Sequence, residues 1–487
     1  MNPAVQILAV GAAVPRFRLQ AADVNAAWGR KGGRGQVAVC AHDEDVLTLA
    51  ADAAHRALVA SGLQTDIVDG LWWGTARPPF AEGPSHAVLA RAIGLSHRSG
   101  GILCAGSPHS GMEALLGAAD AVGAGSARVA LVVVSDALVP GLGTSFESRV
   151  GAGAAAIVLV SHGGTAQLVE RVSRTYAFLD RYRGDDETET RDLYDPRLFR
   201  EEMFLPTVRE IGEQLAGSGA RAGAHAWSLP DPDGRLGASV AKQIGVDTDD
   251  LASAAVYREL GDTGAAAALL GGIASLASVG TTTIVGFGGG RATGVQITVK
   301  TPVRGADTVA RTFGKGIPTT YAATLQSRKQ LVASGETVQM GVPPGSAQFV
   351  RGIDEMLGLL GARCVDCGTI NTPPSIHPHC ISCGSAKFVL EPLARRGTVH
   401  TFVVNQTMPP PFVAPLPIAV VDLEDGTRVM LQCIGDGSDI EIGTDVELVL
   451  RRYAHERGVP VYGYKVRATG TTTTTSTTHS NATEPNA

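Results

Sequence analysis

The stretch Gly101-Ile-Leu-Cys-Ala-Gly-Ser107 precedes the pattern from which the fold can be worked out. The apolar residues after it recur at the spacing of one helix face: Met112, Leu115, Leu116, Ala119 and Val122. This stripe predicts a buried helix, and the apolar run Val129–Val134 predicts a strand buried on both faces. We therefore expect Cys104 at a glycine-flanked turn opening a core helix, where unpaired backbone N–H groups and the helix dipole favour a thiolate. A small buried side chain without chemistry is the alternative, since free cysteines are commonly buried.

Composition narrows the class of protein. A chain of 487 residues suggests about three folded units. The net charge of -6, with scattered lysines and arginines, argues against a nucleic-acid surface. No basic leader with a signal-length apolar stretch and no long apolar run stands in the sequence, so we expect a cytoplasmic protein without a membrane partner.

Strand and helix patterns alternate along the first 300 residues, which predicts an α/β layered fold. Residues 43–58 read as a helix with an acidic start. A second small-residue turn and core helix, Gly261–Leu276, is followed by the strand pattern Thr282–Gly290. Turn, helix and buried strand thus occur twice, which suggests two similar halves. The charged region Asp180–Arg200 is expected on the surface or in an insertion.

Four of the seven cysteines form the most specific motif of the chain. Cys364-Val-Asp-Cys367 and Cys380-Ile-Ser-Cys383 are two C-x-x-C pairs twelve residues apart. Pairs of this kind hold a tetrahedral zinc ion in zinc ribbons, and four thiolates leave no open position, so the zinc is expected to be structural. A redox-active dithiol pair, or a ribbon that has lost its metal, is the alternative.

Five strand-like runs follow the cysteine motif and fit a small barrel of the OB type. They are Thr398–Val404, Ile418–Leu423, Arg428–Ile434, Val446–Leu450 and Val459–Val466. OB barrels often bind oligonucleotides, but the acidic charge disfavours that function here. The threonine-rich residues from Gly470 onward are expected to be disordered.

Residues 1 to about 300 resemble the thiolase superfamily, above all 3-oxoacyl-ACP synthase III and HMG-CoA synthase-like proteins. The resemblance rests on 43–50, the Cys104-Ala-Gly turn, Ser135-Asp-Ala, 151–156 and 261–266. Residues 355–467 resemble the zinc-ribbon and OB-fold domain of the DUF35 type, which accompanies thiolase-like enzymes that act on acyl-CoA.

The resemblance implies a duplicated five-layered α-β-α-β-α body, usually a homodimer. It also implies a cysteine nucleophile, here Cys104, at a tunnel for the phosphopantetheine arm of CoA or acyl carrier protein. The implied domains are 1-165 and 166-300 for the two halves, 301-354 for a connecting segment, 355-393 for the zinc ribbon, 394-468 for the OB-fold and 469-487 for the tail.

Several positions depart from the family's pattern. Asp262 stands where the family has its asparagine, Pro230 stands at the histidine position, and Ala76 lies near the position of the HMG-CoA synthase glutamate. A buried Asp262 could act as the base, and His225 or His109 could replace the lost histidine, although lone histidines are more often structural.

Three functions remain open from the sequence. The first is an acyl-CoA- or acyl-ACP-dependent acyltransferase or condensing enzyme that forms an acyl-enzyme on Cys104. The second is a non-catalytic acyl-CoA-binding or scaffold subunit for a partner thiolase-like enzyme. The third is a thiolase-like retro-aldol lyase, which needs no acyl-enzyme.

Overall fold

In the computed structural model the described residues are 4–33, 35–192, 195–217, 225–331, 346–408, 412, 414–456 and 459–469. They fall into two units. The first unit, called the body, takes in the described residues up to 331 together with 346–358 and 450–463. The second, called the C-terminal unit, takes in 359–449 and 464–469. The predicted tail lies outside the described residues beyond Thr469.

A sheet of nine strands forms the frame of the body. In spatial order the strands are β5 (Gly100–Ala105), β4 (Gly70–Thr75), β6 (Val129–Ala137), β7 (Ala152–Val160), β1 (Gln6–Ala13), β8 (Ala166–Thr175), β11 (Arg291–Val299), β10 (Gly280–Gly288) and β9 (His225–Ser228). The first strand, β1, pairs antiparallel with both β7 and β8. It therefore joins the strands of the first half to those of the second.

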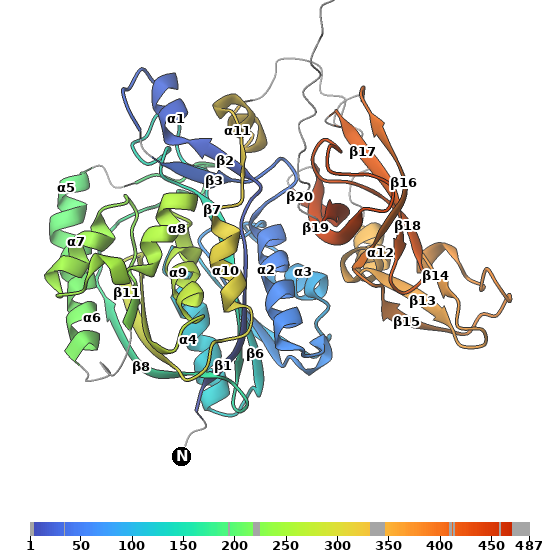
Figure 1. Cartoon of the computed structure of the whole chain (residues 1–487), viewed down its shortest axis with the longest axis horizontal. Coiled ribbons are helices and arrows are strands. Elements are labelled where there is room, and N and C mark those ends of the chain that lie inside the picture. The colour runs from blue at the N-terminus through green and yellow to red at the C-terminus, as the bar shows by residue number, and fades with distance from the viewer. Residues whose placement is uncertain are drawn as a thin grey trace, which may run out of the picture. The chain divides into compact units, whose positions relative to one another are not determined.

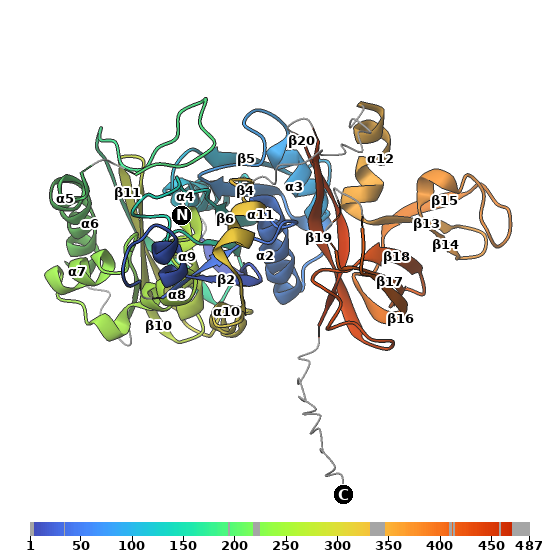
Figure 2. The ribbon, with the colours of Figure 1, turned by 90° about the horizontal axis from the view of Figure 1, so that it is seen from above.

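Helices cover both faces of each half-sheet (Figure 1). The main ones are α2 (Val46–Ser61), α3 (Ser85–Ile93), α4 (Ser110–Gly123), α6 (Leu205–Gly217), α7 (Leu236–Gln243), α8 (Ala252–Leu260), α9 (Ala267–Ser275) and α10 (Ala306–Phe313). Both views place α2 and α3 on one side of the body, α6 and α7 on the other, and α4, α9 and α10 between them (Figure 2). This order gives the predicted five layers and confirms the expected fold class.

The second helix illustrates how the sequence fixes these elements. Asp45 caps α2 by accepting hydrogen bonds from the backbone N–H groups of Leu47 and Thr48, and the Thr48 hydroxyl accepts the Asp45 N–H in return. Gly62 ends the helix with φ of 72°, a left-handed conformation that glycine adopts without strain. The predicted helical face of α2 is buried throughout. The predicted stripe of α4 is buried except for Leu116, which is partly buried.

Shorter elements complete the body. They are β2 (Phe17–Gln20), α1 (Ala21–Ala27), β3 (Gln36–Val39), α5 (Pro196–Leu198), the π-helix η2 (Phe199–Phe204), β12 (Ile317–Pro318), α11 (Tyr321–Ser327) and α12 (Ser346–Gly358). Strands β12, β2 and β3 form a small separate sheet.

The ribbon and the barrel are built from two further sheets. The ribbon sheet has the order β14 (Ile370–Asn371), β13 (Leu360–Cys364) and β15 (Phe388–Pro392). The barrel sheet has the order β18 (Arg428–Gln432), β17 (Leu416–Leu423), β16 (Arg396–Asn405), β19 (Asp445–Glu456) and β20 (Val459–Ala468). Each of the five predicted strand runs lies in one of these barrel strands, with bounds shifted by a few residues. In the described part of the chain, every helix is too short or too polar to cross a membrane.

Candidate active site

The two core helices α4 and α9 begin at the same place in the body. A β-carbon added to Gly111 of α4 would lie 2.4 Å from the backbone oxygen of Ala265, in the short helix η4 (Gly264–Ala266) that leads into α9. Only glycine allows backbones to approach this closely. The two predicted turn-and-helix repeats therefore meet at their helix starts.

A fully buried carboxylate ties this junction together. Asp136, in the Ser135-Asp-Ala segment of β6, accepts hydrogen bonds from the N–H groups of Ala265 (2.7 Å) and Ala76 (3.0 Å) and from the Thr75 hydroxyl (3.0 Å). Burial raises the pKa of Asp136 to about 7, against the opposing effect of these hydrogen bonds. Because its oxygens are occupied by backbone donors of both halves, Asp136 is best explained as a structural residue.

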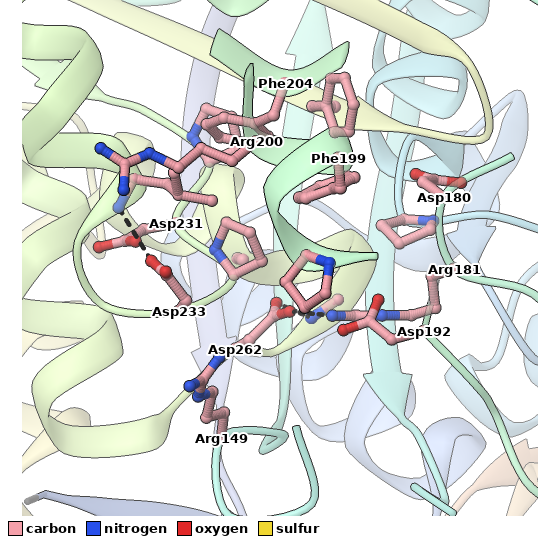
Figure 3. A pocket seen from close by; sticks show the side chains of 18 of the residues that line it. Arg149, Asp180, Arg181, Asp192, Phe199, Arg200, Phe204, Asp231, Asp233 and Asp262 are labelled. Carbon is pink, nitrogen blue, oxygen red and sulfur yellow. Dashed lines mark hydrogen bonds and ion pairs between the residues drawn. The ribbon is translucent and has the colours of Figure 1, made fainter. Parts of the chain in front are cut away.

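A cavity of about 540 Å³ opens beside the two helix starts (Figure 3). Its apolar lining includes Pro108, Met112, Phe199, Phe204, Pro230, Leu236 and Phe287. Its charged lining comprises Arg149, Asp180, Arg181, Asp192, Arg197, Arg200, Glu201, Asp231, Asp233 and Asp262. The first half contributes Pro108, Met112, Ser145 and Arg149 to the lining, and Pro108 lies in the turn before α4. A proline there offers no nucleophile.

Asp262 lies in this cavity but is fully engaged by protein groups. Its Oδ2 accepts a hydrogen bond of 2.8 Å from Arg181, and its Oδ1 accepts the N–H of Gly264 at 2.9 Å. Both side chains of the ion pair are 8% exposed. Figure 3 shows the pair in the centre of the lining. The charged region Asp180–Arg200 was expected on the surface or in an insertion. The surface alternative is wrong at Arg181, because its guanidinium is buried against Asp262.

Asp231 is a carboxylate of a different kind. It follows Pro230 in the segment where the family's histidine was expected, and its Oδ1 is buried without a hydrogen-bond partner among the described residues. Burial raises the pKa of Asp231 to about 6, while backbone N–H groups of Gly237 and Gly234 oppose the rise and Asp233 adds to it. Asp231 therefore combines a place in the cavity with a proton affinity near neutrality.

A second, larger cavity of about 1100 Å³ adjoins the first. Four residues line both cavities: Ser145, Arg149, Asp231 and Asp233. The second cavity is also lined by Arg30, Arg235 and Arg258. Together with Arg149 they make its charge suitable for an anionic group such as a phosphate.

Aromatic side chains form one wall of the first cavity. Phe204 and Phe287 meet edge to face with ring centroids 5.0 Å apart, and Phe199 lies 6.0 Å from Phe287. Phe199 and Phe204 are the two ends of the π-helix η2. This wall can accept an apolar group away from the carboxylates.

Cys104 lies elsewhere than predicted. It is the fifth residue of β5, paired with Gly74 of β4, and α4 begins only at Ser110. The expectation that it occupies the helix-opening turn is therefore wrong, because strand pairing continues to Ala105. Cys104 is absent from the lining of both cavities, and burial raises the pKa of its thiol, with Glu113 adding to the rise. A thiol with this shift is a weaker source of thiolate.

The two candidate histidines also lie outside both linings. His225 stacks on Trp227 with ring centroids 5.0 Å apart, and its Nε2 lies 2.8 Å from the Thr283 hydroxyl. His109 is completely buried, with Nε2 2.9 Å from the Thr293 hydroxyl. Of Cys104, Asp262 and His225, the structure thus brings only Asp262 to the cavity.

Sequence reasoning missed Asp231 as a site residue. The Pro230-Asp-Pro-Asp233 run lies in the segment where the family has its histidine. Two carboxylates beside the altered position were the available signal.

The four predicted zinc ligands lie together in the C-terminal unit. Their sulfur atoms are all within 4.8 Å of one another, with 3.6 Å between Cys364 and Cys383 and 3.5 Å between Cys367 and Cys380. A tetrahedral Zn²⁺ with ligand bonds of about 2.3 Å requires sulfur separations of about 3.8 Å. Asn371 supports the second pair by accepting the Ile381 N–H at 2.9 Å. The donor set fits a closed zinc site.

Known proteins resemble the two units separately. The body is similar to a structure of MvaS in complex with 3-hydroxy-3-methylglutaryl coenzyme A, with a TM-score of 0.57, 18% identity, and 70% of this chain and 96% of that chain covered. Its sequence is 31% identical over 156 residues to the hydroxymethylglutaryl-CoA synthase of Thermococcus onnurineus, which is 32% of this chain and 45% of the relative. The chain spans about half the length of the synthases it matches. The body therefore has a thiolase-like fold of the HMG-CoA synthase type.

The C-terminal residues give the closer family relation. Residues 390–451 match the family described as "ChsH2, C-terminal OB-fold domain". A DUF35 domain-containing scaffold protein of Methanothermobacter thermautotrophicus is 36% identical over 125 residues, which cover 24% of this chain and 91% of that protein. Through this region the chain belongs to the DUF35 domain family, here joined to a thiolase-like body.

Proposed function

We propose that the body binds an acyl-CoA thioester and makes or breaks a carbon–carbon bond next to its carbonyl, without forming an acyl-enzyme. The observation that carries the proposal is the lining of the two adjoining cavities. It offers carboxylates at their junction and no cysteine. Of the three functions left open by the sequence, this geometry favours the aldol-type reaction over acyl transfer through Cys104.

The arginine-lined cavity suits the CoA portion of the substrate. Arg30, Arg149, Arg235 and Arg258 can neutralise phosphate groups, and guanidinium forks bind phosphate oxygens in pairs. The similarity to MvaS, whose structure holds a coenzyme A thioester, supports the same assignment. Acyl carrier protein would present the same phosphopantetheine arm without the nucleotide.

The smaller cavity suits the acyl portion. Its aromatic wall of Phe199, Phe204 and Phe287 favours an apolar substituent, while Asp231 and Asp262 lie at the polar end. A β-hydroxyacyl thioester with an apolar group on the β-carbon matches both features. Comparing a panel of acyl-CoA substrates would identify the acyl group.

The test is a turnover assay with the full chain. Purified protein is incubated with β-hydroxyacyl-CoA thioesters of graded apolar bulk, and mass spectrometry follows the carbonyl product and the shortened acyl-CoA. We expect cleavage by the wild type and undiminished cleavage by Cys104→Ala. An acyl adduct on the wild type that disappears in Cys104→Ala together with turnover would overturn the proposal in favour of acyl transfer.

A second function is favoured by one observation, the similarity of the C-terminal region to a scaffold protein. In this alternative the chain binds acyl-CoA and supports a separate thiolase-like enzyme. Binding of CoA without turnover by the isolated chain, with turnover restored by a co-purifying enzyme, would favour it.

The proposed function includes one structural Zn²⁺ and a homodimer. The four clustered thiolates would hold the zinc ion, whose chemistry is to cross-link the ribbon. The dimer is proposed because β5 is the last strand of the body sheet, and its Ile102 is 52% exposed. An open strand edge of this kind can pair with a second copy. Elemental analysis and light scattering test the two statements.

A further inference from the structure

We propose that Asp231 is the catalytic base that moves the proton of the carbon–carbon bond step. The inference rests on the proposed function and assigns its central chemical role to one side chain. Neither the cysteine nor the histidine pattern of the sequence points to this residue.

The position of Asp231 supports this role. The reacting carbons of an acyl-CoA lie between the carrier arm and the rest of the acyl group. If the arm fills the arginine-lined cavity and the acyl group fills the aromatic one, those carbons lie where the cavities adjoin. Among the described residues, those that line both cavities are Ser145, Arg149, Asp231 and Asp233.

Asp233 and Asp262, the carboxylates nearest in role to Asp231, already accept hydrogen bonds from protein groups. Asp233 Oδ1 accepts the N–H groups of Arg235 and Leu236, each at 2.9 Å, at the start of α7. Asp262 is held by Arg181 and by the Gly264 N–H. Asp231 alone of the three has a buried oxygen, Oδ1, without a hydrogen-bond partner among the described residues. A buried carboxylate oxygen without a donor disfavours the ionised form, so Asp231 binds a proton more readily than the other two carboxylates.

The surroundings of Asp231 suit proton transfer near neutral pH. Burial raises the pKa of Asp231 to about 6, and a base whose pKa lies near the working pH transfers protons efficiently. The charged and titratable groups around it are Asp233, Asp262, Arg149, Arg181, Arg200 and Tyr257. The backbone N–H groups of Gly237 and Gly234 favour its ionised form, and the carboxylates of Asp233 and Asp262 oppose it.

The proposed step balances without a further reactant. The ionised Asp231 takes the proton of the β-hydroxyl group, and the O–H electron pair forms the new carbonyl bond. The Cα–Cβ bond breaks, and its electron pair passes to the α-carbon as the thioester enolate. Protonation of that carbon by the acid form of Asp231 gives the shortened acyl-CoA and returns the carboxylate. The reverse sequence of the same steps is the aldol addition.

The experiment compares Asp231→Asn with wild type in the full chain, using the β-hydroxyacyl-CoA that the wild type cleaves best. We expect kcat to fall about 100-fold or more with KM within about threefold, since base catalysis contributes on this scale. Binding of CoA by calorimetry is expected to be unchanged. Asp247→Asn is the matched control, because it removes the charge of an exposed carboxylate outside both cavities while asparagine can still cap the short helix; it should retain activity.

A second readout keeps the inference testable if the asparagine variant folds poorly. The wild-type kcat is expected to fall on the acid side with an apparent pKa near 6, and a short acyl-CoA in D2O is expected to exchange its α-hydrogens at the same pH dependence. If Asp231→Asn cleaves substrate as well as the wild type does, the role of Asp231 is overturned while the proposed function stands. The same holds if the wild-type kcat does not fall on the acid side. A wild type that binds CoA but neither cleaves nor exchanges would overturn the proposed function as well.

Discussion

The four cysteines of the ribbon and Cys104 of the body stand in opposite surroundings. The four ribbon sulfurs face one another within 4.8 Å, whereas Cys104 lies in a strand, away from the linings of both cavities. A metal knuckle is made by short-range spacing, so the sequence alone indicates the cluster. The environment of one cysteine depends on strand pairing with residues far away. The C-x-x-C pairs therefore predict the surroundings of their cysteines, whereas the sequence around Cys104 does not.

The largest expected effect is at the ribbon. Cys383→Ser should reduce zinc from about one ion per chain to near zero, because a closed site needs all four thiolates. Zinc binding of this type contributes on the order of 10 kcal/mol to folding of small domains. Elemental analysis and limited proteolysis of the C-terminal unit would measure the loss. Cys433→Ala, a buried cysteine of the same unit outside the cluster, is the control and should keep its zinc. Equal zinc content in both variants would contradict the cluster.

The next effect concerns the ion pair between Asp262 and Arg181 in the body. This pair lies in the cavity where the sequence predicted the thiol of Cys104. Asp262→Asn removes the carboxylate that pairs with the buried Arg181 guanidinium and leaves Asp192 and Asp180 to oppose its charge. It should lower the free energy of unfolding by about 3 kcal/mol. Urea denaturation would measure the change. Adding Arg181→Gln should restore part of the loss, because the unpaired charge is then removed. A single variant as stable as wild type would show that the pair contributes little.

A smaller effect concerns pH. The pKa of Asp231 in the folded chain, about 6, is above the value of about 3.9 for an exposed aspartate, so the folded state holds this proton more tightly. The stability that protonation gives is present at low pH and is lost as pH rises from about 4 through about 6. Asp231→Asn should therefore stabilise the body by about 1–3 kcal/mol above pH 6, allowing for partial solvent screening. Thermal unfolding between pH 4 and pH 8 would measure it. A variant with the wild-type pH dependence would refute this assignment.

The smallest effect is expected at Cys104. It is half-buried and makes no polar contact within either cavity, so Cys104→Ala should change the free energy of unfolding by about 1 kcal/mol or less. Turnover should remain within about twofold of wild type. Intact mass after incubation with acyl-CoA should give no adduct on either protein. A strong loss of activity would restore the acyl-enzyme function and remove the contrast with the ribbon.

Local patterns predicted most of the architecture. The stripe of α4, the run in β6 and the five barrel strands follow from residue spacing, since each element buries the face that its own sequence makes apolar. The helix start was placed wrongly beside Cys104, because the pairing of Cys104 with Gly74 depends on a strand about thirty residues away. Gly101 belongs to that packing too, since a β-carbon there would lie 1.8 Å from the Leu71 oxygen.

The candidate site was harder to predict because its chemistry is non-local. Asp262 and Arg181 are far apart in sequence, and nothing in the charged region around Arg181 distinguishes the buried arginine from its exposed neighbours. Asp231 owes its proton affinity to burial by other segments, which residue types do not reveal. The spacing of the ribbon cysteines, by contrast, is enough to predict that their four sulfur atoms lie together.

Strand β1, which joins the strands of the two halves, has a consequence for synthesis of the chain. It is synthesised before its partners β7 and β8, which begin at Ala152 and Ala166. At about 5–20 residues per second, an apolar strand therefore waits on the order of ten seconds before its first partner is made. During that interval α2, which packs on β1 and begins at Val46, is the first described helix able to shelter it. Early docking of α2 would make the nascent chain less prone to aggregate. Variants that weaken this helix would therefore have a large effect on the yield of folded protein and a smaller effect on the equilibrium stability of the protein that does fold.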